Sequence, residues 1–263
     1  MSLKFFTLAS GSSGNAVFIG SEKSGLLIDA GLSGKEICAK LEQNEVSPDS
    51  LQGILVTHEH KDHIKGVGII SRKLDLPVFA TEGTWQAMEE SIGKIAEKNR
   101  KYLEVDSCLE IGDLKVEVAA TSHDAQEPVA FTVHQGERSV GLATDTGKIT
   151  GGLRKNVTGC NALVLEANHD PTMLRQGPYP AYLKKRIASV LGHLSNQMSG
   201  EALAEFITGK TEQVVLAHLS EQNNLPSLAL ETVKQVLREK GFDDFPEITV
   251  APRYKAHKVS VLK

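Results

Sequence analysis

Residues 53–63, Gly53-Ile54-Leu55-Val56-Thr57-His58-Glu59-His60-Lys61-Asp62-His63, place an apolar run directly before four side chains that can bind a metal ion. The run 53–57 has the length and composition of a strand that is buried on both faces of a sheet. Alternate residues of an extended segment point to the same side, so His58 and His60 are expected to face one ion. Asp62 and His63 can then turn toward a second ion. The stretch therefore predicts a metal site at the end of a buried strand.

One loop cannot complete the coordination of two ions, so further ligands are expected where other strands end. In three places an apolar run leads directly into a residue that can bind a metal: 119–122 into His123, 141–144 into Asp145, and 214–217 into His218. A single histidine of this kind is more often an ordinary polar or core residue. Combined with the loop 58–63, the three positions favour convergence on one site at the rim of a sheet.

Short apolar runs and helical periodicities predict a layered α/β (α+β) fold around this site. The predicted strands are 3–8, 16–19, 26–28, 53–57, 77–80, 115–120, 130–134, 139–143, 162–166 and 213–217. The spacing of Ser33 and Glu36 is that of a capping box and predicts the start of a helix. Apolar residues at helical spacing predict further helices around 67–74, 85–92, 203–207 and 230–237.

The predicted strands and helices occur in two similar halves, about 1–125 and 126–263. No Pro/Gly/Ser-rich linker divides them, so we expect residues 1–263 to form one domain. Two sheets that each carry helices on one face give a four-layer αββα sandwich.

Composition excludes several classes of protein. The 263 residues are 40% apolar and 24% charged, which is incompatible with a disordered chain. A net charge of −4 argues against a protein that coats a polyanion, so any contact with nucleic acid must be a local patch. The three cysteines form no C-x-x-C pair, the N-terminus does not look like a signal peptide, and no run approaches the ~20 apolar residues of a membrane span. We therefore expect a soluble, cytoplasmic protein without a membrane partner.

The candidate ligands and their order resemble the metallo-β-lactamase fold superfamily. The resemblance covers most of the chain and rests on Asp29 after a strand, the loop 58–63, His123, Asp145 and His218. The chain is most similar to the YycJ (WalJ) subgroup of metal-dependent phosphodiesterases and exonucleases, through segments 10–15, 57–60, 122–125, 144–147, 166–170, 192–196 and 217–220. No cysteine stands at a ligand position, which argues against a true β-lactamase.

This resemblance implies two divalent metal ions, Zn²⁺ or Mn²⁺. It implies that one ion is bound by His58, His60 and His123, and the second by Asp62, His63 and His218. Asp145 would bridge the two ions, and Asp29 would hold a ligand histidine or the loop itself.

The resemblance also implies a hydrolase that cleaves phosphodiester bonds with a metal-bridging hydroxide and that degrades DNA from the 5′ end. Asp62, Asp145 and His193 are the expected catalytic residues. In similar enzymes a histidine at the position of His193 protonates the leaving oxygen or binds phosphate, although a plain helix-capping turn also explains it.

Contacts to the substrate are expected from Ser12, Asn15, Asn168 and His169, each of which is also explained by an ordinary turn. The basic run 184–186 would act as a phosphate track only if it lies on the rim of the site. Three alternatives stay open: a small-molecule phosphodiesterase that opens cyclic phosphates, a thioester or lactone hydrolase on the same metals, and a binding module without activity.

Overall fold

Two seven-stranded sheets pack face to face at the centre of the computed structural model, which describes residues 2–263. In spatial order the first sheet contains β14 (Ser260–Leu262), β1 (Leu3–Ala9), β2 (Ala16–Gly20), β3 (Gly25–Ile28), β4 (Leu51–Leu55), β5 (Val78–Thr81) and β6 (Arg100–Leu103). The second contains β13 (Glu247–Val250), β12 (Gln213–Ala217), β11 (Ala162–Glu166), β10 (Arg138–Ala143), β9 (Val129–Gln135), β8 (Leu114–Ala120) and β7 (Cys108–Ile111).

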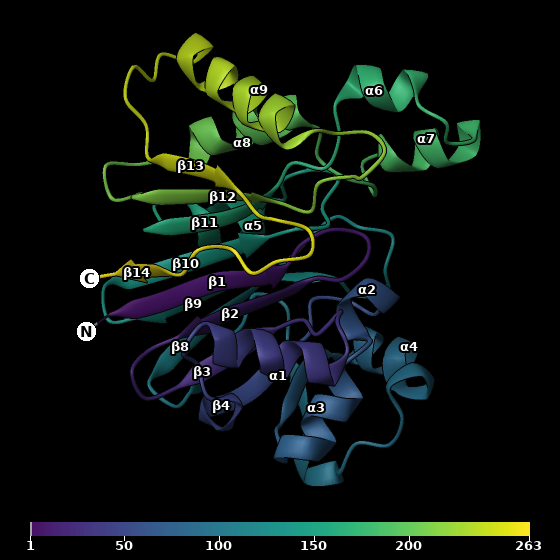
Figure 1. Cartoon of the computed structure of the whole chain (residues 1–263), viewed down its shortest axis with the longest axis vertical. Coiled ribbons are helices and arrows are strands. Elements are labelled where there is room, and N and C mark those ends of the chain that lie inside the picture. The colour runs from purple at the N-terminus through teal and green to yellow at the C-terminus, as the bar shows by residue number, and fades with distance from the viewer. Residues whose placement is uncertain (1) are drawn as a thin grey trace.

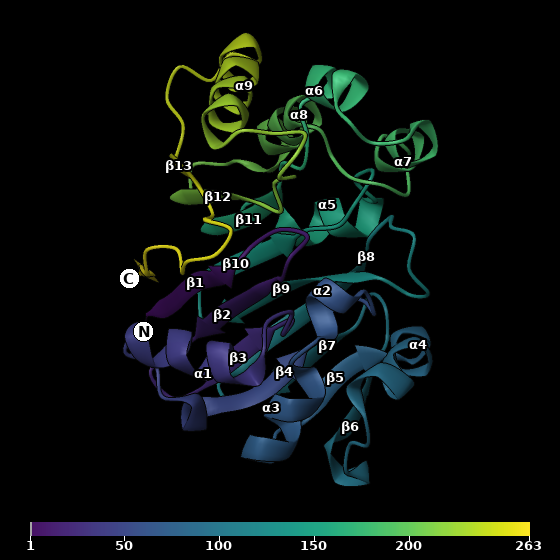
Figure 2. The same ribbon diagram turned by 45° about the vertical axis from the view of Figure 1, so that its right-hand side comes forward.

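Helices cover the outer face of each sheet (Figures 1 and 2). Beside the first sheet lie α1 (Gly34–Gln43), α2 (Lys61–Ile64), α3 (Val67–Leu74) and α4 (Glu82–Ile92), with short 3₁₀ turns at Pro48–Ser50 and Glu97–Asn99. Beside the second lie α5 (Gly151–Val157), α6 (Pro171–Gln176), α7 (Ala181–Ile187), α8 (Asn196–Phe206) and α9 (Pro226–Glu239). This arrangement confirms the predicted four-layer αββα sandwich.

Each sheet begins as an antiparallel meander and continues as parallel strands. In the first sheet β1, β2 and β3 are antiparallel, whereas β3, β4, β5 and β6 run parallel. In the second sheet β7 to β10 are antiparallel and β10 to β13 are parallel. Parallel neighbours end at the same edge of a sheet, and ligand sites lie outside the carboxyl ends of such strands. The residues that follow β3, β4, β10, β11 and β12 are therefore brought to one rim.

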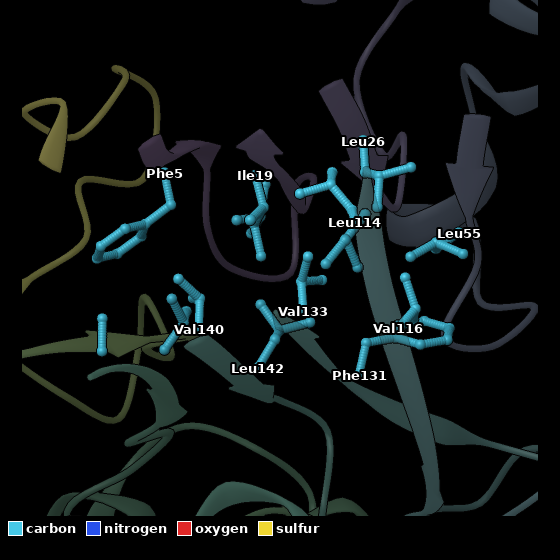
Figure 3. Close-up of a cluster of buried hydrophobic side chains, with 14 of the residues drawn as sticks. Phe5, Ile19, Leu26, Leu55, Leu114, Val116, Phe131, Val133, Val140 and Leu142 are labelled. Carbon is cyan, nitrogen blue, oxygen red and sulfur yellow. The ribbon is translucent and has the colours of Figure 1, made fainter. Parts of the chain in front are cut away.

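The core between the sheets comes from the alternation of side chains along the strands. Figure 3 shows Phe5, Ile19, Leu26 and Leu55 of the first sheet opposite side chains of the second, which include Leu114, Val116, Phe131, Val133, Val140 and Leu142. All of these are at most 1% exposed. Full burial of one such side chain contributes about 1.5–3 kcal/mol, so this layer fixes the strands that carry the site.

The helices follow their predicted patterns closely. The capping box at the start of α1 is present, because Ser33 Oγ accepts from the Glu36 N–H and Glu36 Oε2 accepts from the Ser33 N–H. Trp85, Met88 and Ile92 of α4 are all buried against the first sheet. The helices α4, α8 and α9 begin before their predicted apolar residues, and α8 ends at Phe206, so Ile207 is its C-cap rather than a residue of its apolar face. Among residues 2–263, no helix combines the length and the apolar character needed to cross a membrane.

Candidate metal centre

Asp29 holds the loop that contains four of the candidate ligands. β4 ends at Leu55, two residues earlier than predicted, and the chain turns at Thr57. Asp29 Oδ1 accepts from the Thr57 N–H at 2.8 Å, and Oδ2 accepts from the Thr57 hydroxyl at 2.8 Å. The same Oδ2 lies 2.7 Å from His63 Nδ1. Because both its oxygens are engaged, Asp29 fixes the start of the loop and the ring of His63 at its end.

Three of the candidate residues share an unusual backbone geometry directly after their strands. Asp29, Asp145 and His218 have φ angles of 57°, 55° and 54°, in the left-handed region. Non-glycine residues adopt this region infrequently, and such residues gather at functional sites. The turn moves each side chain out of the strand alternation and over the rim of its sheet.

The histidines of the site are oriented through one ring nitrogen. Nδ1 of His63 faces Asp29, Nδ1 of His123 lies 3.1 Å from the Gly192 carbonyl, and Nδ1 of His218 lies 2.8 Å from Glu166 Oε1. Each contact leaves Nε2 as the nitrogen that faces the other candidate ligands. Histidines that bind metals are usually held in this way, because the partner of the outer nitrogen fixes the tautomer and the ring orientation.

The candidate ligand atoms form two groups with one carboxylate between them. The donor atoms of His58, His60 and His123 lie within 4.8 Å of one another, and so do those of Asp62, His63 and His218. Asp145 belongs to two further groups, one with His58 and His63 and one with Glu166, His193 and His218. Zn²⁺ binds nitrogen and oxygen at roughly 2.0–2.2 Å, so such groups are compact enough to share an ion.

Two buried atoms of the cluster support its fit to a metal. Asp145 Oδ2 and His218 Nε2 are buried and have no hydrogen-bond partner among residues 2–263. An unsatisfied buried polar atom costs free energy, and an ion beside it would remove that cost. The donors are imidazole nitrogens and carboxylate oxygens without a thiolate, a set that suits divalent ions. The cluster therefore has the composition and geometry of a divalent-metal site.

The charges of the cluster divide its histidines into two kinds. Burial, with the neighbouring His63, holds the pKa of His58 well below its usual value, and burial also lowers the pKa of His123. Burial would lower the pKa of His218 too, but Asp145 and Asp62 raise it to about 10. His58 and His123 are thus neutral donors, whereas protons on His218 would have to leave before a metal binds there.

The Asp62 carboxylate is stabilised in its charged form. Burial alone would raise the pKa of Asp62, but His218 and His63 lower it by more, to well below its usual range. Asn15 is buried and donates from Nδ2 to Asp62 Oδ2 at 3.1 Å. The structure thus places the side-chain amide of Asn15, a predicted substrate contact, against a candidate ligand.

Glu166 is a central residue of the site that the sequence analysis did not identify. It is the last residue of β11 and is fully buried. Its Oε1 lies 2.7 Å from His193 Nδ1 and 2.8 Å from His218 Nδ1, while Oε2 accepts from the Leu194 N–H at 3.0 Å. Burial raises the pKa of Glu166, but His193 and His218 lower it to well below its usual range. The available signal was an acidic residue that ends an otherwise apolar strand.

A pocket of about 270 Å³ lies against the cluster. His60, Asp62, His123, Asp145 and His218 line one part of it, together with His193, Ser12 and Asn168. The Nδ1 contact with Glu166 leaves Nε2 of His193 available to this pocket. Arg186, the last residue of the basic run 184–186, is also part of the lining.

The remaining predicted residue, His169, lies elsewhere. Its side chain is 3% exposed and is not part of the pocket lining, and its backbone forms a bridge with Ser195. Burial lowers the pKa of His169 to about 4. This geometry gives its predicted contact with a substrate no support.

Comparison with known proteins identifies relatives over nearly the whole chain. The model of a family described as the β-lactamase superfamily domain matches residues 25–219. The chain is 47% identical to exodeoxyribonuclease YycJ of Bacillus anthracis over 242 residues, which cover 92% of each protein. It is 41% identical to exodeoxyribonuclease WalJ of Streptococcus pneumoniae, over 90% of this chain and 88% of that protein.

Solved structures share the fold at low sequence identity. The metallo-β-lactamase fold protein YhfI of Bacillus subtilis is 16% identical, with a TM-score of 0.73 over 99% of each chain. Zn²⁺-bound PqqB of Methylobacterium extorquens is 17% identical, with a TM-score of 0.70 over 97% of this chain and 99% of that one. At these identities the similarity demonstrates the architecture alone.

Proposed function

Because the chain belongs to the β-lactamase superfamily, and within it to the family of the exodeoxyribonucleases YycJ and WalJ, we propose that it degrades DNA from the 5′ end. It is a metal-dependent hydrolase that acts on phosphodiester bonds. One observation carries this proposal: the seven candidate ligands come from distant parts of the chain and form one cluster, and five of them line a single pocket together with His193. Such convergence of titratable groups in a cavity is typical of an active site.

Two divalent ions would occupy the centre, either Zn²⁺ or Mn²⁺. His58, His60 and His123 would hold one ion and Asp62, His63 and His218 the other, with Asp145 shared between them. When bound, the ions supply Lewis-acid stabilisation of the charge that develops on the phosphodiester, and they lower the pKa of water.

His193 would donate the proton that the leaving oxygen needs. An alkoxide is a poor leaving group, and a positioned general acid contributes roughly 10²–10⁴-fold to such a reaction. Glu166 accepts the Nδ1 proton at 2.7 Å, so the proton for the leaving oxygen would come from Nε2. After the bond breaks, the product strand would leave with that proton as its terminal hydroxyl group.

Asp62 and Asp145 would act on the attacking water. Both carboxylates line the pocket. Asn15 engages Oδ2 of Asp62, so Oδ1 would accept a hydrogen bond from the water and orient it toward phosphorus. Ser12 and Asn168 are the residues of the pocket that would contact the substrate outside the ligand cluster.

The size of the pocket favours one alternative, a small-molecule phosphodiesterase. A volume of about 270 Å³ is close to the lower limit of about 300 Å³ for small-ligand sites. A DNA substrate, in contrast, would place the protein in the compartment of the chromosome, which agrees with the expected cytoplasmic location.

We also propose that residues 1–263 act as one domain, since the core between the sheets takes side chains from both predicted halves.

One experiment separates these functions. The metal-loaded protein is incubated with single-stranded and double-stranded DNA and RNA, labelled at the 5′ or the 3′ end. We expect release of labelled mononucleotides from 5′-labelled DNA, and only late release from 3′-labelled DNA. The variants His58→Ala and Asp145→Ala, checked for folding by circular dichroism, should release nothing.

Other patterns would contradict the proposal in distinct ways. Internal cuts would replace the exonuclease by an endonuclease. Hydrolysis of a cyclic nucleotide without cleavage of any polymer would favour the small-molecule enzyme. Full activity in both variants would exclude the metal centre as the active site.

A further inference from the structure

The pocket beside the metal centre has an apolar wall that the hydrolytic chemistry does not require. Tyr179, Leu183 and Ile187 line it from α7 and the turn before that helix. Leu183 and Ile187 are four residues apart on one face of α7, and Tyr179 lines the same pocket from the turn before the helix. The attack on phosphorus and the departure of the leaving oxygen both involve polar groups. Neither step therefore needs apolar side chains.

This wall is fixed relative to the ligand cluster. Arg186 of α7 pairs with Asp124, the neighbour of His123. The His193 N–H donates to the Ile187 carbonyl at 2.9 Å, and the Ser122 hydroxyl donates to the Val190 carbonyl at 2.7 Å. These contacts tie the C-terminal end of α7 to residues on both sides of the centre. The apolar wall and the candidate ligands therefore form one preorganised cavity.

A nucleotide combines the two chemistries that this cavity offers. Its phosphate has anionic oxygens, which the divalent ions held by the ligand cluster would bind. Its base is a flat, largely apolar ring. The volume of about 270 Å³ suits one such unit beside the ligand cluster. Aromatic side chains bind unpaired bases by stacking, with little regard to sequence.

We propose that Tyr179, Leu183 and Ile187 form a subsite for the base of the terminal nucleotide of the strand being cut, with Tyr179 stacking on that base. This inference rests on the proposed exonuclease function and deepens it. The apolar wall would place the cleaved bond one nucleotide from the end of the strand, because only an unpaired terminal base can leave its stack and enter the cavity. Tyr179, Leu183 and Ile187 are specificity-determining residues in this scheme.

The test pairs a change in the enzyme with a change in the substrate. Two single-stranded 5′-phosphorylated oligonucleotides are compared, one normal and one whose first nucleotide has an abasic tetrahydrofuran in place of its base. Removal of the base should lower kcat/KM of the unmodified enzyme by roughly 5- to 100-fold. Tyr179→Ala should suffer a similar loss on the normal strand and lose nothing further on the abasic one. Tyr179→Phe, which retains the ring, should behave like the unmodified enzyme.

Tyr182→Ala is the matched control. Tyr182 lies on α7, three residues after Tyr179, is 76% exposed and does not line the pocket, so its removal should leave both rates unchanged. Hydrolysis of methyl 4-nitrophenyl phosphate, which has no base, should be equal within about 2-fold in all variants.

The outcomes separate this inference from the function on which it rests. If the unmodified enzyme cleaves neither oligonucleotide, the exonuclease proposal fails and the subsite with it. Alternatively, the enzyme cleaves both oligonucleotides, and Tyr179→Ala lowers kcat/KM by the same factor whether or not the base is present. The two changes would then act independently, so the base would not contact Tyr179 and only the subsite would be overturned. A loss on methyl 4-nitrophenyl phosphate equal to that on DNA would likewise overturn it, since the tyrosine would then support the centre itself.

Discussion

His193 and His218 direct their Nδ1 atoms at the same carboxylate oxygen, Glu166 Oε1, at distances of 2.7 and 2.8 Å. The first is the proposed proton donor and the second a proposed metal ligand. Their rings lie 5.1 Å apart between centroids. One buried carboxylate thus fixes the orientation of two groups with different tasks, so the acid and the metal centre are positioned by a single side chain.

Glu166→Gln should impair metal binding and catalysis together. An amide carries no charge, and its nitrogen in place of Oε2 cannot accept from the Leu194 and Thr146 N–H groups, so the side chain that orients both rings is displaced. We expect metal affinity to fall by about 10- to 100-fold, as for other partners of ligand histidines, with a parallel loss of kcat. Isothermal titration with Mn²⁺ and steady-state kinetics measure the two effects. Glu201→Gln, at an exposed position of α8, is the control, and equal behaviour of the two variants would contradict the role of Glu166.

His193→Ala should slow substrates according to their leaving groups. A DNA strand leaves as an alkoxide that needs a proton, whereas a nitrophenolate leaves without one. We therefore expect a loss of roughly 10²–10⁴-fold on DNA and a much smaller loss on a bis-aryl phosphodiester. Rates on both substrates, compared with those of His134→Ala on β9, give the measurement. Equal losses on the two substrates would leave His193 as a phosphate-binding residue instead.

Gly31→Ala should displace the ligand loop. A Cβ at position 31 would lie 1.6 Å from the carbonyl oxygen of Asp62 and 2.5 Å from the Asn15 nitrogen, atoms now joined by a 2.8 Å hydrogen bond. We expect a loss of about 1–3 kcal/mol in the free energy of unfolding, together with weaker metal binding. Urea titration is the measurement.

Gly151→Ala is the control for that substitution, since a Cβ there would meet nothing within 4 Å. It should change the free energy of unfolding by less than about 0.5 kcal/mol. A Gly31→Ala protein as stable as this control would show that the loop tolerates the displacement.

Asp29→Asn should weaken the loop without removing the left-handed turn, because asparagine also tolerates positive φ. An amide nitrogen in place of Oδ2 can no longer accept from Thr57 Oγ1 and His63 Nδ1. We expect a loss of about 1–3 kcal/mol in the free energy of unfolding from these buried groups. Chemical denaturation in the presence of a chelator isolates this effect, and an unchanged midpoint would contradict it.

Removal of metal should lower the thermal midpoint of the protein. An ion at 100 times its Kd stabilises the folded state by about 2.7 kcal/mol, which corresponds to roughly 5–10 °C for a chain of this size. Differential scanning fluorimetry with a chelator, and then with Zn²⁺ or Mn²⁺ restored, measures the shift. The double variant of His58→Ala and Asp145→Ala should not respond, and an equal response would place the bound ion elsewhere.

Much of this site could be predicted from the sequence because the candidate ligands lie in the loop 58–63 or shortly after other apolar strands. His123, Asp145 and His218 are identifiable in the second way. β10 and β12 run parallel to β11, and β8 points in the same direction as β10 because both are antiparallel to β9, so these strands end at one rim. Glu166 ends a strand in the same manner, but no local sequence pattern indicates which side chains a single buried acid contacts. Asn15 was predicted as a substrate contact because its turn suggested one, whereas its contact with Asp62 spans 47 residues of chain.

The sequence by itself determined the αββα architecture and the candidate ligands, because strand periodicity and ligand spacing are properties of short segments. Only the tertiary structure decided that Glu166 joins His193 to His218, and that Tyr179, Leu183 and Ile187 face the same cavity. The physical reason is that hydrogen bonds and cavity walls form between side chains that are close in space. The packing of the two sheets and of α7 brings those side chains together, and no local sequence pattern predicts that packing.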